Sequence, residues 1–183
     1  AEYFLGKFFG GYSLIAFIIL LNMVLGVVSA TITFGQQASL SVLPGVFLAQ
    51  AYAALLFFTV AFMIGELIRR SSLSYIFSAA LFFTSTIFGL YLTVIYTLTG
   101  DVFYKHIQLY IPSSPIASLP LLYVNGSLPS GVASLLSSIE GLAGGSVESS
   151  IPFSILLISI YFAAAFIVAF VFFELSDVSR KVS

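Results

Sequence analysis

Four long apolar runs dominate the chain, and each is free of charged residues except near an end. They cover residues 11–34, 43–68, 73–98 and 151–175. A helix needs about 20 residues to cross the hydrocarbon core of a bilayer, so each run is long enough to span it. The first run is too long for a cleavable signal peptide. The pattern predicts an all-α polytopic membrane protein with four transmembrane helices, and we treat residues 1–183 as a single membrane domain.

Local signals mark where these runs begin. Pro44 lies near the first helical turn of the second run, where proline is favoured. Ser71 and Ser72 are suited to cap the third run, and Ser150 with Pro152 marks the start of the fourth. Because the connection between the second and third runs is short, we expect them to form an antiparallel hairpin.

The connection between the third and fourth runs, residues 99–150, is long and chemically varied. Four prolines are expected to break any long helix in it: Pro112, Pro115, Pro120 and Pro129. Residues 129–144 then show an amphipathic pattern, with one apolar face made of Val132, Leu135, Leu136, Ile139 and Leu142. The pattern predicts a short external helix, either in the outer interface or re-entrant and covered by the bundle. A lid over a pathway is the rival interpretation.

Composition supports the membrane assignment and excludes several functions. Hydrophobic residues make up 60% of the chain and charged residues 7%, whereas soluble proteins carry about a quarter charged residues. The lipid bilayer is therefore the expected environment. With a net charge of −1, no cysteine and one histidine, we expect no nucleic-acid partner, no metal site and no cofactor. The chain lacks a glycine-rich phosphate loop, paired carboxylates and a Ser/His/Asp set, so we do not expect an enzyme.

The few cations predict an orientation. If both termini are cytoplasmic, five of the six cations lie on that side: Lys7, Arg69, Arg70, Arg180 and Lys181. Only Lys105 falls outside, which is the positive-inside pattern. We therefore expect an integral plasma-membrane protein with both termini cytoplasmic and residues 99–150 external.

The arginine pair also has a local interpretation. Arg69 and Arg70 follow the second run, where exposed carbonyls favour cations, and Glu66 lies one turn earlier and can pair with either. The pair is either a topological anchor or a docking point for a cytosolic partner. The candidate docking residues of the cytoplasmic face are Lys7, Glu66, Arg69 and Arg70.

Polar residues inside the runs are few. The candidates are Asn22 in the first run, Gln50 in the second, and Thr84 and Ser85 in the third. Hydroxyl groups usually bond to carbonyls of their own helix, whereas the amides of Asn22 and Gln50 are expected to need partners elsewhere. These residues either hold helices together or line a transport pathway. No acid or base lies at the centre of a run, which argues against a proton relay.

Small residues recur four positions apart, a spacing that lets membrane helices approach closely. The pairs are Gly6 with Gly10, Ala49 with Ala53, and Ala165 with Ala169. They predict packing within the chain, and homo- or hetero-oligomer formation through one of these faces remains an alternative.

Asn125-Gly126-Ser127 matches the acceptor pattern for N-glycosylation. Its predicted external position strengthens this interpretation. Asn-Gly is also an ordinary turn signal, so glycosylation of Asn125 and a plain turn are both open.

Several stretches resemble the permease subunits of type-2 ABC exporters. "FLGKFFGG" resembles the entry to one of their middle spans, and "GELIRRSSLSYIFSAALFF" looks like a hairpin with a cytoplasmic turn. "LYIPSSPIASLPLL" resembles their external proline-containing stretch, and "ELSDVSRK" the basic tail after the last helix. Such permeases have six spans, so the four runs here would correspond to the last four.

The resemblance implies a transmembrane permease component that pairs with a second unit and docks a separate ATP-binding subunit near Lys7, Arg69 and Arg70. It implies that ATP-driven closure tilts the helices and alternates access to a substrate path. Two other functions remain open. One is a non-catalytic accessory subunit of a larger, respiratory-type membrane complex, and the other is a cell-envelope anchor.

Overall fold

The computed structural model describes residues 2–35, 40–68, 71–125 and 150–181. The helices are α1 (Glu2–Phe34), α2 (Leu43–Ile68), α3 (Ser71–Thr99), α4 (Val102–Leu109), α5 (Ser113–Asn125) and α7 (Ile151–Lys181), with a short 3-10 turn at Leu40–Val42. No strand occurs in these ranges, so the predicted all-α class is confirmed. Four of the helices are long and apolar enough to cross a membrane: α1, α2, α3 and α7.

The predicted boundaries are close to those observed, with one correction. The first helix begins at Glu2, not near residue 11, because the residues before Gly11 continue the helix and bury Phe4 and Phe8. At its other end α1 stops at Gly35, whose φ of +82° suits a helix C-terminal glycine and whose N–H donates to the Thr31 carbonyl at 3.0 Å.

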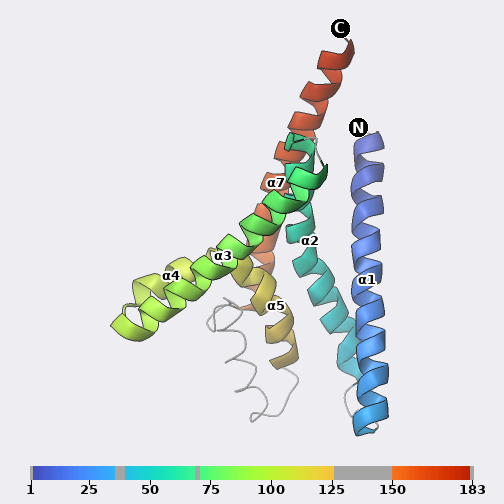
Figure 1. Cartoon of the computed structure of the whole chain (residues 1–183). Coiled ribbons are helices and arrows are strands. Elements are labelled where there is room, and N and C mark those ends of the chain that lie inside the picture. The colour runs from blue at the N-terminus through green and yellow to red at the C-terminus, as the bar shows by residue number, and fades with distance from the viewer. Residues whose placement is uncertain (1, 36–39, 69–70, 126–149, 182–183) are drawn as a thin grey trace.

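The helices do not form a closed bundle (Figure 1). α1 and α2 run side by side, and α7 packs against α2. α2 and α3 pack together near the end of α2 and the start of α3, as the predicted hairpin requires, and α3 then tilts away while α4 doubles back along it. α5 fills the space between α2 and α7, and a small core joins these three helices through Leu56, Leu119 and Ile158.

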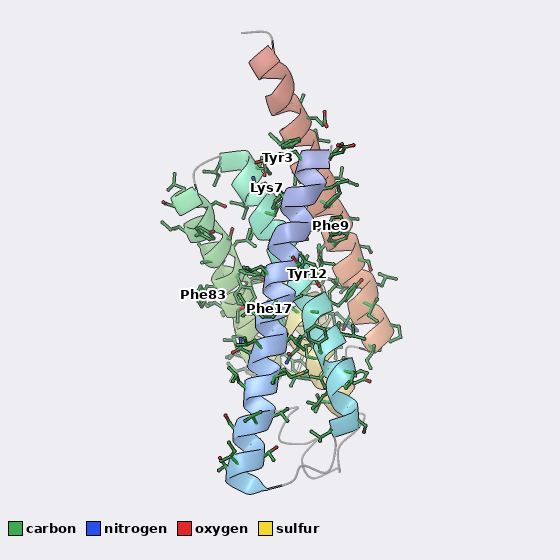
Figure 2. The ribbon with its side chains drawn as sticks, turned by 90° about the vertical axis from the view of Figure 1, so that its right-hand side faces the viewer. Tyr3, Lys7, Phe9, Tyr12, Phe17 and Phe83 are labelled. Atoms are coloured by element: carbon green, nitrogen blue, oxygen red, sulfur yellow. The ribbon has the colours of Figure 1, made fainter. Side chains whose placement is uncertain are left out.

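Aromatic rings of α2 and α7 pack against the start of α1, the helix that carries Tyr3, Lys7 and Phe9 in Figure 2. The Phe4 ring lies 5.2–5.5 Å from four rings, those of Phe62, Phe166, Phe170 and Phe173. Farther along, the Tyr12 hydroxyl donates a hydrogen bond to the Ala51 carbonyl at 2.9 Å. Beyond this point the large side chains of α1 are mostly exposed, so its second half has little packing within the chain.

The three small-residue pairs behave differently. Ala53, Ala165 and Ala169 are buried and Ala49 packs against the core, which confirms packing within the chain. A Cβ added at Gly6 or Gly10 would meet nothing within 4 Å, so this pair makes no close helix contact with the residues that the structure describes. Among the described residues, no close approach between helices requires a glycine at either position.

The segment after α3 is more helical than its prolines suggested. Pro112 precedes α5, Pro115 lies in its first turn, and Pro120 lies inside it. A first-turn proline costs no hydrogen bond, and burial of α5 between α2 and α7 stabilises the helix around Pro120. The predicted amphipathic helix of residues 129–144 lies outside the described residues.

Candidate functional site

A break in the helical backbone lies beside the middle of α2 and of α3. α4 ends at Leu109, and α5 begins at Ser113 after an irregular stretch. The Ser113 N–H donates to Ser85 Oγ at 3.2 Å, and Ser85 is the central residue of α3. Irregular backbone at this depth is stable only where protein buries it or where it lines a cavity. The α4–α5 break meets that requirement because α2, α3 and α7 surround α5.

Buried serines gather at this break. Ser113 is 3% exposed and Ser114 is fully buried, and neither hydroxyl has a hydrogen-bond partner among the described residues. One turn later the hydroxyls of Ser118 and Ser154 share a hydrogen bond of 3.3 Å that joins α5 to α7. An unpaired buried hydroxyl costs about 1–3 kcal/mol, so the hydroxyls of Ser113 and Ser114 lower the free energy of unfolding.

Ser113 lines a small cavity among α2, α3 and the start of α5. Its volume is about 20 Å³, and its other walls include Leu56, Phe82 and Ser85. A cavity needs about 10–15 Å³ to hold one water molecule, which also requires polar partners. The surface exposed to this cavity is apolar, so the cavity offers a water molecule no such partner and suits a small apolar group.

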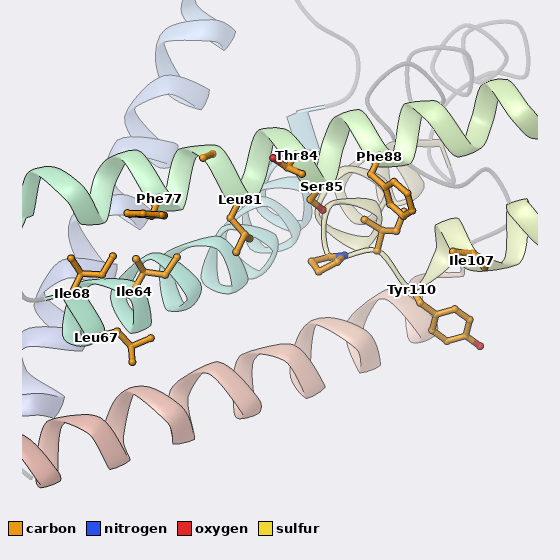
Figure 3. Close-up of a pocket in the computed structure, with 13 residues that line it drawn as sticks. Ile64, Leu67, Ile68, Phe77, Leu81, Thr84, Ser85, Phe88, Ile107 and Tyr110 are labelled. Carbon is orange, nitrogen blue, oxygen red and sulfur yellow. The ribbon is translucent and has the colours of Figure 1, made fainter.

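A larger groove of about 920 Å³ adjoins this cavity in the angle between α2 and α3 (Figure 3). Ile64, Leu67 and Ile68 of α2 form one wall, and α4 with the break closes the far end. The α3 wall is mostly apolar, with two polar residues near its far end, and consists of Phe77, Ala80, Leu81, Thr84, Ser85 and Phe88. Leu81, Ser85 and Pro112 line both spaces, so the groove and the small cavity are neighbours.

The structure sorts the predicted intramembrane residues into two groups. Thr84 and Ser85 both line the groove. The expectation for Asn22 is wrong, because its amide nitrogen donates to the Ile18 carbonyl of its own helix at 2.9 Å on an exposed face. Gln50 lies half-buried on α2 and is not among the residues that line the groove.

Sequence reasoning missed a group of deeply buried serines. Ser113, Ser114, Ser118 and Ser154 were not among the candidates, because serines beside prolines usually mark a loop. The available signal was the apolar character of Ser113–Val124, a shorter apolar helix of a length suited to burial inside a membrane domain. Recognising it required knowledge that α5 packs between α2 and α7.

The cytoplasmic-face candidates are only partly brought together. Lys7 Nζ lies 2.5 Å from Glu66 Oε1. The Glu66 carboxylate, which was expected to pair with Arg69 or Arg70, therefore forms an ion pair with Lys7 of α1. Lys7 Nζ also lies 5.5 Å from the centroid of the Phe62 ring. Glu66 is 12% exposed and Lys7 51% exposed. Arg69 and Arg70 lie outside the described residues, so the pairing expected for them stays a prediction.

We expect the Lys7–Glu66 pair to contribute about 0.5–1 kcal/mol to the docking of α1 on α2, the range of a partly exposed ion pair. Lys7→Ala and Glu66→Ala should each lower the free energy of unfolding, and the double variant should lose less than the sum. Detergent-unfolding titrations of all four proteins give this coupling energy. Strictly additive losses would show that the pair contributes nothing.

Asn125 is the last residue of α5. Gly126 and Ser127 of the glycosylation pattern lie outside the described residues, so modification of Asn125 stays a prediction.

The chain was compared with known proteins at three levels. No protein-family model, no curated protein and no solved structure matches it. The chain is thus assigned to no family by similarity.

Proposed function

We propose that this chain is the transmembrane permease component of an ABC-type exporter and works with a separate ATP-binding subunit. The observation that carries the proposal is the α4–α5 break, level with the centres of α2 and α3 and beside a groove of about 920 Å³. Transport proteins build their binding sites near the bilayer midplane from interrupted helices. A purely structural bundle has no need for this interruption or for its two unpaired hydroxyls.

The lining of the groove limits what could pass. Its walls are almost entirely apolar, and the polar atoms gather at the far end, where Thr84 and Ser85 lie near the break. Such a lining suits an apolar or amphipathic molecule that enters sideways from the bilayer, rather than a hydrated ion.

We expect Ser114→Ala to increase the free energy of unfolding by about 1 kcal/mol, because it removes a buried hydroxyl that has no partner among the described residues. Ser118→Ala is the matched control on the same helix. Its hydroxyl is bonded to Ser154, so its removal should destabilise the protein. Detergent-unfolding titrations compare the two. Equal losses in both variants would show that Ser114 is satisfied in the membrane.

Two measurements test the permease proposal. The tagged full chain, isolated from its own membranes in mild detergent, should carry a nucleotide-binding subunit. Because the chain has no cysteine, a single cysteine can then report on the break in that complex. Labelling of Ser85→Cys by a membrane-permeant maleimide should change when ATP is added. Labelling of Phe83→Cys, on the 63% exposed outer side of α3, should not change.

The permease proposal would be refuted by a complex that lacks a nucleotide-binding subunit, or by labelling of Ser85→Cys that does not change when ATP is added. Cofactor-bearing partners would instead favour the accessory subunit of a larger membrane complex. The observation behind that second candidate is the poor packing of α1 beyond Tyr12, where Phe17 is 61% and Ile32 81% exposed. Since packing drives helix association in lipid, a partner helix could add contacts there that the chain itself does not supply.

A further inference from the structure

The carbonyl of Tyr110, the residue that caps the end of α4, is bonded to α7. The Tyr161 hydroxyl of α7 donates a hydrogen bond to it. The Tyr110 ring also packs edge-on against the ring of Phe153, with the centroids 5.8 Å apart. α4 itself lies along α3, so these contacts hold the end of α4 against α7.

Hydroxyl groups in the helices of this protein share a common pattern. Many donate to the carbonyl four residues earlier in their own helix, as serine and threonine in membrane helices often do. The residues that do so include Thr31, Thr33, Thr59, Ser78, Thr86, Thr93, Thr99 and Ser159. For Ser114 the equivalent carbonyl is that of Tyr110. The irregular stretch between α4 and α5 separates them, and the buried Ser114 hydroxyl has no partner among the described residues.

We propose that the α4–α5 break is a two-state element in which two donors compete for the Tyr110 carbonyl. In one state, that of the structure, Tyr161 holds the carbonyl and the break is open. In the other state the irregular stretch closes into a helical turn, Ser114 donates to the carbonyl, and α4 separates from α7. The exchange concerns this break alone, so it goes beyond the permease proposal and holds with or without transport.

Backbone geometry makes the two donors exclusive. In a continuous helix each carbonyl points along the axis toward the residue four positions later, so closing the break turns the Tyr110 carbonyl toward Ser114 and away from α7. Pro112 leaves a kink in the closed state but no unpaired group. It has no N–H, and the Gln108 carbonyl that a helical residue 112 would use already accepts from the Ile111 N–H at 3.2 Å. Each state satisfies one donor and leaves the other unpaired, so neither is favoured by a large margin.

The movement is carried by α3 and α4 together. Gln108 Nε2 donates to Thr93 Oγ1 at 2.8 Å, and Lys105 Nζ lies 5.2 Å from the centroid of the Tyr96 ring, so α4 is tied to α3. Figure 1 shows these two helices extending away from α1 and α7. Tyr110 also lines the far end of the groove (Figure 3). Release of Tyr110 from α7 therefore shifts the α3–α4 pair and reshapes that end of the groove.

Distances between two spin labels test the proposal, because the chain has no cysteine that must first be removed. The labels are placed at Phe103→Cys on α4 and Ile167→Cys on α7, which are 62% and 60% exposed, and the full chain is reconstituted in phosphatidylcholine vesicles. We expect two distance populations. Tyr161→Phe removes one donor and keeps the ring, so it should raise the ratio of the longer to the shorter distance about fivefold, equivalent to about 1 kcal/mol. Ser114→Ala removes the other donor and should lower this ratio by a similar factor.

Tyr52→Phe is the matched control. Its hydroxyl also bonds to α7, at 2.6 Å from Ser159 Oγ, but it comes from α2 rather than from α4. Its removal should leave the distances unchanged.

Three results would overturn the proposal. The first is a ratio that Tyr161→Phe or Ser114→Ala leaves unchanged. The second is the same shift for Tyr52→Phe as for Tyr161→Phe. The third is a shift in the same direction for Tyr161→Phe and Ser114→Ala, which would indicate general loosening of the helices. The measurement uses neither ATP nor a partner protein, so failure of the two-state break and failure of the permease proposal are distinguishable.

Discussion

Phe4→Ala should detach the start of α1 from the rest of the protein. The Phe4 side chain is fully buried and contacts four rings on α2 and α7, so its removal leaves a cavity at the centre of the aromatic cluster. Replacing a buried phenylalanine by alanine typically costs about 3–5 kcal/mol. We expect the low end of this range, because lipid chains can partly occupy the space. Detergent-unfolding titrations measure the loss.

Phe9→Ala is the matched control, since the Phe9 side chain is on the same helix but 62% exposed. It should change the free energy of unfolding by less than about 1 kcal/mol, because lipid replaces the ring. Similar losses for Phe4→Ala and Phe9→Ala would show that the aromatic cluster does not hold α1 in place.

Gly45→Ala should disturb the contact between α2 and α5. A Cβ at this position would overlap the ring of Tyr123, so the ring or the whole of α5 has to move. Overpacking of this kind typically costs about 1–3 kcal/mol, which exceeds the gain from alanine as a helix former. The free energy of unfolding should therefore fall, and the double variant Gly45→Ala with Tyr123→Ala should recover part of the loss.

Gly26→Ala separates overpacking from helix propensity. A Cβ at Gly26 would meet nothing within 4 Å, so this substitution should stabilise α1 by about 0.5–1 kcal/mol. If Gly45→Ala and Gly26→Ala were both stabilising, the Tyr123 side chain would have to reach another position at little cost in free energy. In that case the α2–α5 contact would not depend on a close approach at Gly45.

The candidate site was only half visible in the sequence. Ser85 and Thr84 were identified because polar residues stand out in an apolar run, and both line the groove. Asn22 stood out for the same reason, yet its amide bonds to its own helix and faces outward. Polarity within a run therefore does not separate a residue that lines a groove from one that satisfies itself locally. That distinction depends on which way each helix face points.

The sequence by itself determined the four spanning helices, because hydropathy and length are local properties and lipid forces each apolar run to satisfy its own backbone. It also determined where α2 and α7 begin, through their prolines and serines. Only the tertiary structure decided that α5 is buried between α2 and α7, that Glu66 pairs with Lys7, and that α3 tilts away to open a groove. These features depend on contacts between residues far apart in the chain. The shapes of the helix surfaces decide which apolar faces pack together, and this information is not visible as a pattern within any one segment.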